Sequence, residues 1–139
     1  MRLINILICL CILTGCTKKV TKEDLTQLNG YWEIDKVIFH DGSTKEYNVN
    51  TSIDYIEISA LKGFKKKVQP KFDGTYTTSN NTVFFSISEI DGVFKIHFKN
   101  GLSDRTEQII SISEHNFSVS TKEGITYNYR RYQPININQ

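Results

Sequence analysis

The stretch Val93–Asn100 reads VFKIHFKN and alternates apolar with polar residues from Phe94 to Lys99. Phenylalanine and isoleucine share one face of an extended chain, while His97 and the lysines between them share the other. This period of two predicts a β-strand with one buried and one solvated face. Asn116–Thr121 and Ile125–Tyr132 alternate in the same way, so the pattern extends to the C-terminal third of the chain.

Runs of β-forming residues follow one another from Gly30 onward, separated by short breaks that carry Gly, Asn, Asp or Ser. Short connections place consecutive strands side by side and antiparallel. Pro70 obscures the start of the third run, because proline has no N–H to donate to a neighbouring strand. The predicted strands are Tyr31–His40, Ile53–Ser59, Val68–Thr78, Thr82–Ile90, Val93–Asn100, Arg105–Ser113, Asn116–Thr121 and Ile125–Tyr132.

The predicted fold class is therefore all-β. Eight antiparallel strands with one apolar face remove their exposed edges by closing into a small up-and-down barrel. A barrel of this strand number is either nearly filled by its own side chains or holds one small ligand. A sandwich of two sheets is the structural alternative.

One short helix is predicted before the first strand. Thr21 to Asp24 has the spacing of a capping box, Leu25 and Leu28 follow at helical spacing, and Gly30 ends the turn.

The first fifteen residues have the layout of a secretion signal. Arg2 supplies a positive charge, and Leu3 to Leu13 is almost wholly apolar but far shorter than the ~20 residues that a membrane-spanning helix needs. The run ends Leu13-Thr14-Gly15-Cys16, which resembles the lipobox of bacterial lipoproteins. The resemblance implies cleavage between Gly15 and Cys16, and diacylglyceryl and N-acyl lipid on Cys16.

The expected organisation is a signal peptide over 1–15, a lipidated tether over 16–24, a barrel domain over 25–134 and a tail over 135–139. The chain has three cysteines. Cys9 and Cys11 lie in the expected signal, and Cys16 is used by lipid. No thiol then remains for a disulfide, a metal site or catalysis, so the exported domain relies on its core for stability.

A family resemblance enters at Gly30-Tyr31-Trp32, which is similar to the G-x-W signature of lipocalins and of lipocalin-like lipoproteins of Bacteroidetes. The likeness to those lipoproteins covers roughly 25–134. The segments that resemble them are Leu28 to Val37 (LNGYWEIDKV), Asp41 to Tyr47 (DGSTKEY), Asp73 to Tyr76 (DGTY) and Tyr127 to Tyr132 (YNYRRY).

The resemblance implies that Trp32 lies at the closed end of the barrel with an arginine of the last strand across it. Arg130 and Arg131 both lie in the right place, and Arg131 is favoured because it is in phase with Tyr127 and Tyr129. Gly30, Trp32 and Arg131 are thus expected as a structural signature. The first loop, over 41–52, is short and polar, unlike the long lid of classical lipocalins, so the barrel could be solid inside.

No catalytic or metal-binding pattern emerges. The histidines show no metal-ligand spacing, and no nucleophile elbow or phosphate loop is present. Glu33, Asp35, Asp54 and Glu57 are expected on the outer surface of the barrel. The charge run Lys62 to Lys67 is expected as a solvated loop, in which Phe64, Lys65, Lys66 and Lys67 could contact anionic head groups or an acidic partner.

The sequence therefore predicts a non-enzymatic, lipid-anchored lipocalin-like protein that binds a small apolar or amphipathic ligand in the barrel. The alternative is an accessory lipoprotein with a filled barrel that contacts an envelope protein or glycan. The formal net charge of +2 gives no reason to expect nucleic acid as a partner. No cofactor is expected beyond the lipid on Cys16. Thr17, rather than Asp, follows that cysteine, which by resemblance to lipoprotein sorting favours the outer membrane, facing the periplasm or the cell exterior.

Overall fold

The computed structural model describes residues 18–100 and 103–134. The expected signal peptide, Cys16 and the tail over 135–139 lie outside the described residues. The elements are a 3-10 helix η1 (Glu23–Leu28) and the strands β1 (Gly30–Ile38), β2 (Thr44–Glu46), β3 (Ile53–Ser59), β4 (Lys62–Pro70), β5 (Tyr76–Ile90), β6 (Val93–Asn100), β7 (Ser103–Ile112), β8 (Asn116–Thr121) and β9 (Thr126–Arg131).

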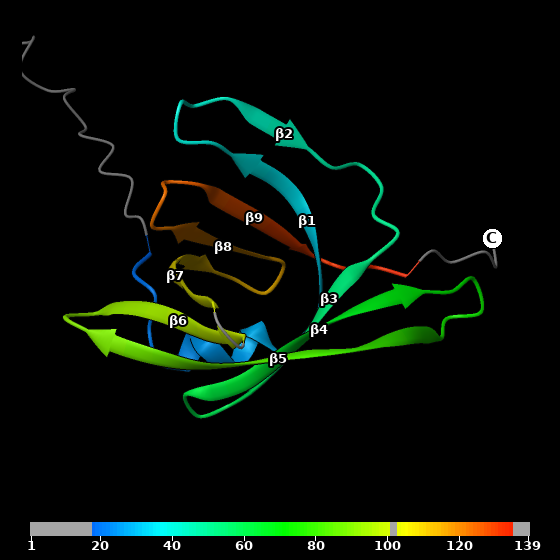
Figure 1. Cartoon of the computed structure of the whole chain (residues 1–139), viewed down its shortest axis with the longest axis horizontal. Helices are drawn as coiled ribbons and strands as arrows, with labels where there is room; N and C mark the ends of the chain where they lie inside the picture. The colour runs from blue at the N-terminus through cyan, green and yellow to red at the C-terminus, as the bar shows by residue number, and fades with distance from the viewer. Residues whose placement is uncertain (1–17, 101–102, 135–139) are drawn as a thin grey trace, which may run out of the picture.

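The strands form one antiparallel sheet that closes on itself, because β1 pairs with β9 from Trp32 through Ile38 (Figure 1). Strands β3 to β9 follow one another in chain order between the two edges of β1. Strand β2 pairs with the second half of β1, on the edge whose first half pairs with β3. Eight strands therefore make an up-and-down barrel, and β2 is an additional short strand within the first loop.

The barrel interior is filled mainly by side chains that alternate inward from the strands. η1 contacts β3 and β7 and adds Leu25 and Leu28 to the same core. The capping box predicted for this helix is present: the Thr21 N–H donates to Asp24 Oδ2 at 2.9 Å, and the Asp24 N–H donates to Thr21 Oγ1 at 3.4 Å. The helix closes one end of the barrel.

The sequence prediction was wrong between residues 62 and 81. The lysine run is not a solvated loop: it forms most of β4, which ends at Pro70. The turn lies at Asp73-Gly74, where Gly74 has a φ of +83°. β5 then continues through Ser79 to Asn81, where a turn was predicted, and a register shift opposite Lys66 to Val68 absorbs the extra residues.

Candidate functional site

The alternation of β4 separates the four residues of the predicted surface contact onto two faces. Lys65 lies opposite Ile56, and Lys67 lies opposite Asp54, so both lysines share the inner face of the sheet with the core. Phe64 and Lys66 lie opposite Glu57 and Tyr55 on the outer face. The lysine run thus places two of its charges in the barrel lumen.

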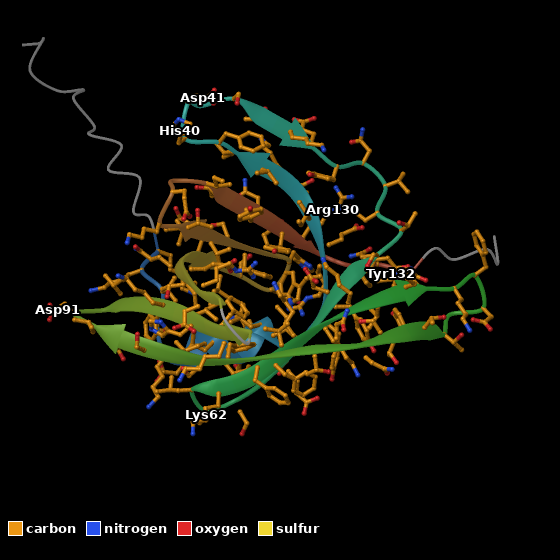
Figure 2. The ribbon with its side chains drawn as sticks, in the orientation of Figure 1. His40, Asp41, Lys62, Asp91, Arg130 and Tyr132 are labelled. Carbon is orange, nitrogen blue, oxygen red and sulfur yellow. The ribbon has the colours of Figure 1, made fainter. Side chains whose placement is uncertain are left out.

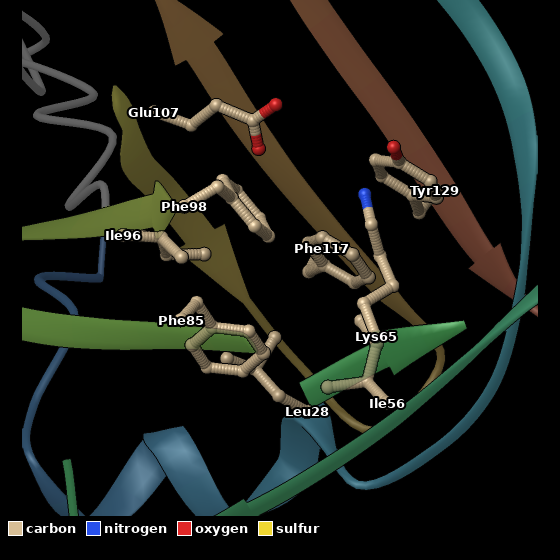
Figure 3. Close-up of a pocket in the computed structure, with 9 residues that line it drawn as sticks. All are labelled: Leu28, Ile56, Lys65, Phe85, Ile96, Phe98, Glu107, Phe117 and Tyr129. Carbon is tan, nitrogen blue, oxygen red and sulfur yellow. The ribbon is translucent and has the colours of Figure 1, made fainter. Parts of the chain in front are cut away.

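The floor of the lumen is apolar and nearly solid. The space left within it is about 20 Å³, which is enough for one water molecule. Phe85 and Phe98 meet edge to face with ring centroids 5.6 Å apart, and Phe117 stacks on Tyr129 at 4.4 Å. The lining residues are Leu28, Ile56, Lys65, Phe85, Ile96, Phe98, Glu107, Phe117 and Tyr129 (Figure 3).

Two buried carboxylates lie above this floor, each paired with a cation. Lys67 Nζ lies 2.8 Å from Asp54 Oδ1 and Arg105 Nε lies 3.2 Å from Glu107 Oε1, which makes two ion pairs. The two acid side chains are 3% and 6% exposed, whereas both cationic partners are 55% exposed. The acids therefore lie inside the lumen, and their partners lie toward its open end.

This arrangement corrects the prediction that Asp54 lies on the outer surface, whereas Glu107 was not singled out from the sequence. Both have a detectable signal. Asp54 is in phase with Ile56 and Ile58, and Glu107 is in phase with Ile109, so each is on the apolar face of its strand.

Lys65 is a third cation in the lumen and has neither an ion pair nor a hydrogen bond among the residues that the structure describes. Its Nζ lies 5.0 Å from the centroid of the Phe98 ring, and the Arg105 guanidinium carbon lies 4.7 Å from the same centroid. Burial lowers the pKa of Lys65, and the carboxylates of Asp54 and Glu107 partly oppose that effect. Figure 3 shows its ammonium group directed between Glu107 and Tyr129.

Tyr129 supplies a neutral hydroxyl to the cavity that Lys65 also lines. Burial raises its pKa well above 10.0, and the charges of Asp54 and Glu107 raise it further. The phenol therefore keeps its proton at neutral pH and can donate a hydrogen bond. The lumen thus combines one ammonium group outside the two ion pairs, that of Lys65, with the hydroxyl of Tyr129 and an aromatic floor.

Gly30, Trp32 and Arg131 come together at the closed end of the barrel. The Arg131 guanidinium carbon lies 3.8 Å from the Trp32 ring centroid, and the fully buried Trp32 donates its indole N–H to the Leu28 carbonyl at 2.8 Å. A Cβ on Gly30, where φ is +122°, would lie 2.7 Å from Arg131 Nη1. The three residues fix η1 to the barrel, which is a structural task.

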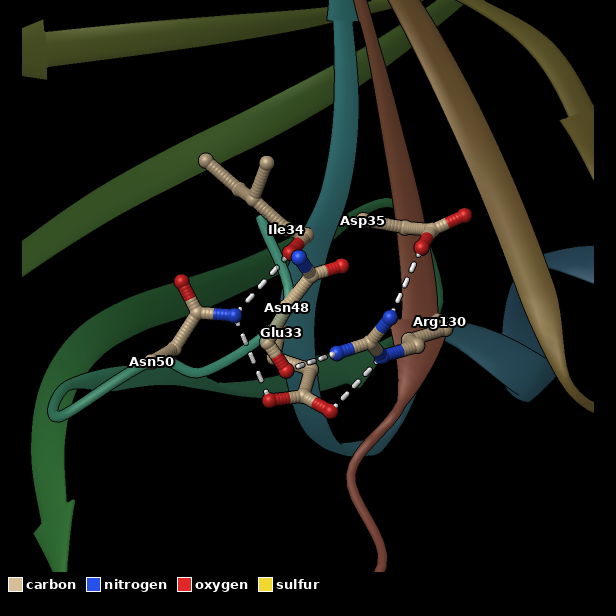
Figure 4. Close-up of polar contacts among 6 residues, drawn as sticks. All are labelled: Glu33, Ile34, Asp35, Asn48, Asn50 and Arg130. Carbon is tan, nitrogen blue, oxygen red and sulfur yellow. Dashed lines mark hydrogen bonds and ion pairs between the residues drawn. The ribbon is translucent and has the colours of Figure 1, made fainter. Parts of the chain in front are cut away.

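Arg130 points the other way, to the outer surface, and does not approach Trp32. It donates to Glu33 Oε1 at 2.8 Å, Asp35 Oδ1 at 2.7 Å and the Asn48 carbonyl at 3.2 Å (Figure 4). Asn50 donates to Glu33 Oε2 at 3.3 Å and to the Ile34 carbonyl at 3.0 Å. These contacts hold the segment 48–50 of the first loop against β1.

The described part of the chain shows no group of three or more His, Cys, Asp or Glu side chains placed to hold a metal ion. His40 lies at the tip of the β1–β2 hairpin, beside Asp41 (Figure 2). His97 exchanges hydrogen bonds with Ser88 at 2.7 Å and Thr106 at 3.2 Å. Within residues 18–100 and 103–134, no helix has the length and hydropathy to span a membrane.

The fold and the lumen define the class: a small antiparallel β-barrel with a polar site above an aromatic floor. No protein-family model and no curated protein matches the chain. Two solved structures are similar over 76% of this chain and 99% of their own, each with a TM-score of 0.48. One is described as a lipocalin-like protein from Bacteroides uniformis, at 14% identity, and the other as an uncharacterized protein from Bacteroides eggerthii, at 12%.

Proposed function

We propose that the protein is a non-enzymatic, lipid-anchored binding protein of the cell envelope. Its barrel lumen takes the anionic end of a small amphipathic ligand. The observation that carries this proposal is the charge balance of the lumen. Asp54 and Glu107 are each paired with a cation, and Lys65 adds a positive charge beyond those two pairs.

An acid group beside Lys65 would relieve the cost of holding an ammonium group away from water. A carboxylate accepts charge-assisted hydrogen bonds, which are roughly twice as strong as neutral ones. Tyr129 lines the same cavity as Lys65, and because its phenol remains protonated it is a second hydrogen-bond donor. The lumen thus offers two donors to one small acceptor.

The size of the cavity limits what enters. Because the space of about 20 Å³ holds roughly one water-sized group, only the compact end of a ligand would enter it, with small shifts of the lining side chains, and a whole alkyl chain would not. The rest of the ligand would extend past Arg105 and Lys67 at the open end. The proposed ligand class is therefore narrowed from any small apolar or amphipathic molecule to an amphipathic molecule with a compact anionic terminus.

Hexanoate and hexan-1-ol, which share chain length and differ in charge, provide a direct test. Isothermal titration uses the processed protein in phosphatidylcholine nanodiscs, with empty nanodiscs as the blank. Lys65→Met removes the positive charge of Lys65 from the lumen. Lys66→Met is the matched control, because Lys66 is the next residue in the chain but lies on the outer face of the sheet. We expect hexanoate to bind the wild type and K66M but not K65M, and hexan-1-ol to bind about tenfold more weakly or not at all. Equal binding of the alcohol, or retention of hexanoate by K65M, would refute the lumen site.

The lipid anchor on Cys16 is the second part of the proposal, and it is supported by the sequence alone. Intact-mass measurement of the mature protein should show a chain beginning at Cys16 with diacylglyceryl and N-acyl additions. Cys16→Ser should abolish both the additions and sedimentation with outer membranes. A mature chain that starts elsewhere and carries no lipid would contradict the anchor.

A second candidate function is that of an accessory lipoprotein that contacts an envelope protein or glycan through its outer face. The nearly solid floor of the lumen supports it, as do aromatic side chains on the outside, such as Phe84, which is 66% exposed.

A further inference from the structure

A cleft of about 430 Å³ lies outside the barrel. Its walls are the first loop over 48–51, the tip of the β4–β5 hairpin over 70–76, and residues 132–134 after β9. In Figure 1 the segment that follows β9 runs toward the end of β4, and the Tyr76 and Tyr132 ring centroids are 6.4 Å apart. This volume falls within the range typical of small-molecule sites, unlike the space in the lumen.

Tyrosines form one wall of the cleft. Tyr76 stacks on Tyr31 with ring centroids 4.4 Å apart and planes 8° from parallel, so the Tyr76 ring is held in a fixed orientation. Tyr132 meets Tyr76 edge to face at 71°. Burial raises the pKa of Tyr76 and Tyr132, so both phenols are neutral and can donate hydrogen bonds. Phe72, which is 81% exposed, adds a third aromatic ring to the lining.

Amide and hydroxyl groups on the first loop and on the hairpin tip form the polar wall of the cleft, and other contacts hold them in place. Arg130 fixes the Asn48 carbonyl, and Asn50 is bonded to β1, as Figure 4 shows. On the hairpin tip, the Thr75 N–H and Oγ1 both donate to Asp73 Oδ1, at 2.9 and 2.6 Å. The polar wall is thus preorganised, which reduces the entropy lost when a ligand binds.

The cleft has little net charge. Its charged lining residues are Glu33, which is already paired with Arg130, and Lys71. Among the residues that line the cleft, an anionic ligand would therefore meet one lysine, and a cationic ligand would meet only a carboxylate that is already paired. Aromatic faces beside neutral hydrogen-bonding groups match a sugar ring, whose C–H face packs on a π-face while its hydroxyls meet amides and phenols.

We infer that this cleft binds a neutral oligosaccharide, with Tyr76 and Tyr132 packing against sugar faces and the 48–51 loop contacting hydroxyls. The cleft is separate from the lumen. The inference rests on the second candidate function, that of an accessory lipoprotein, and names a neutral oligosaccharide as its partner. Arg130 is a positioning residue for the loop wall and does not itself touch the sugar.

The probes are maltohexaose, cellohexaose, xylohexaose and mannohexaose, each titrated to about 10 mM into the processed protein in nanodiscs. Saturation-transfer-difference NMR detects binding, and isothermal titration measures affinity. We expect at least one of these sugars to bind. Tyr132→Ala should then lower its affinity about tenfold, whereas Phe84→Ala, which removes an exposed aromatic ring outside the cleft, should leave it unchanged.

Tyr132→Phe keeps the aromatic ring and removes only the hydroxyl, so it should retain most of the affinity and guard against a folding artefact in the alanine variant. Lys65→Met should bind the sugar like the wild type, and hexanoate should not compete with it, so the two proposals fail separately. The inference is overturned if none of the four sugars binds, or if binding survives Tyr132→Ala unchanged.

Discussion

Replacing Arg131 by methionine should loosen the closed end of the barrel. The guanidinium donates to the carbonyls of Gln27 at 2.8 Å, Asn29 at 2.6 Å and Glu114 at 3.0 Å, and lies over Trp32. Each hydrogen bond contributes about 1 kcal/mol, because its carbonyl can regain water when the arginine is lost. The cation–π contact adds about 1 kcal/mol. We expect the free energy of unfolding to fall by about 3 to 4 kcal/mol, a large part of the typical 5–15 kcal/mol of a domain.

Urea denaturation measures this loss, with fluorescence from Trp32, the only tryptophan, as the signal. For an m-value of roughly 2 kcal/mol/M, the midpoint should move down by about 1.5 to 2 M. Arg131→Lys should recover only a minor part of the loss, since one ammonium group cannot reach three carbonyls. Arg130→Met is the control: its ion pairs to Glu33 and Asp35 lie outside the barrel core and are partly exposed, and each is worth no more than about 1 kcal/mol. A midpoint shift for R131M no larger than that for R130M would refute this account of the closed end.

Two further predictions concern the wall and the charge of the lumen. Gly63→Ala should lower the free energy of unfolding by about 2 to 3 kcal/mol in the same urea assay, because a Cβ would overlap the Glu57 carbonyl oxygen and the Phe85 ring. Gly42→Ala, where nothing lies within 4 Å, should cost only about 1 kcal/mol for its positive φ. Hexanoate affinity, measured by titration from pH 6 to 10, should fall as the pH rises through the lowered pKa of Lys65, while a flat profile would contradict a protonated Lys65 as the partner. Without ligand, the unfolded chain holds the Lys65 proton more tightly than the folded one. Stability should therefore rise with pH from that lowered pKa toward the ordinary 10.5, and Lys65→Met should remove the rise.

The alternation of β6, β8 and β9, the short helix and the tight turns outside residues 62–81 are local properties, and the sequence alone predicted them. Val93–Asn100 alternates because its inner residues fill a core and its outer residues meet water, and the same is true of β8 and β9. The phase of Arg131 with Tyr129 likewise places it on the inner face, beside Trp32.

Which lysines of the run Lys62 to Lys67 lie inside the barrel could be established only from the tertiary structure. A strand with lysine on both faces has no apolar period, so Lys62 to Lys67 could not be told from a solvated loop. The β3–β4 hairpin places Lys67 opposite Asp54, and closure of the barrel brings Lys65 near Glu107, which is distant in sequence; the two carboxylates make the interior tolerant of positive charge. The outer cleft is also nonlocal, since its walls come from three segments that only the folded chain brings together. Local pattern thus set the strands, and long-range packing decided which charges lie inside and where a ligand can bind.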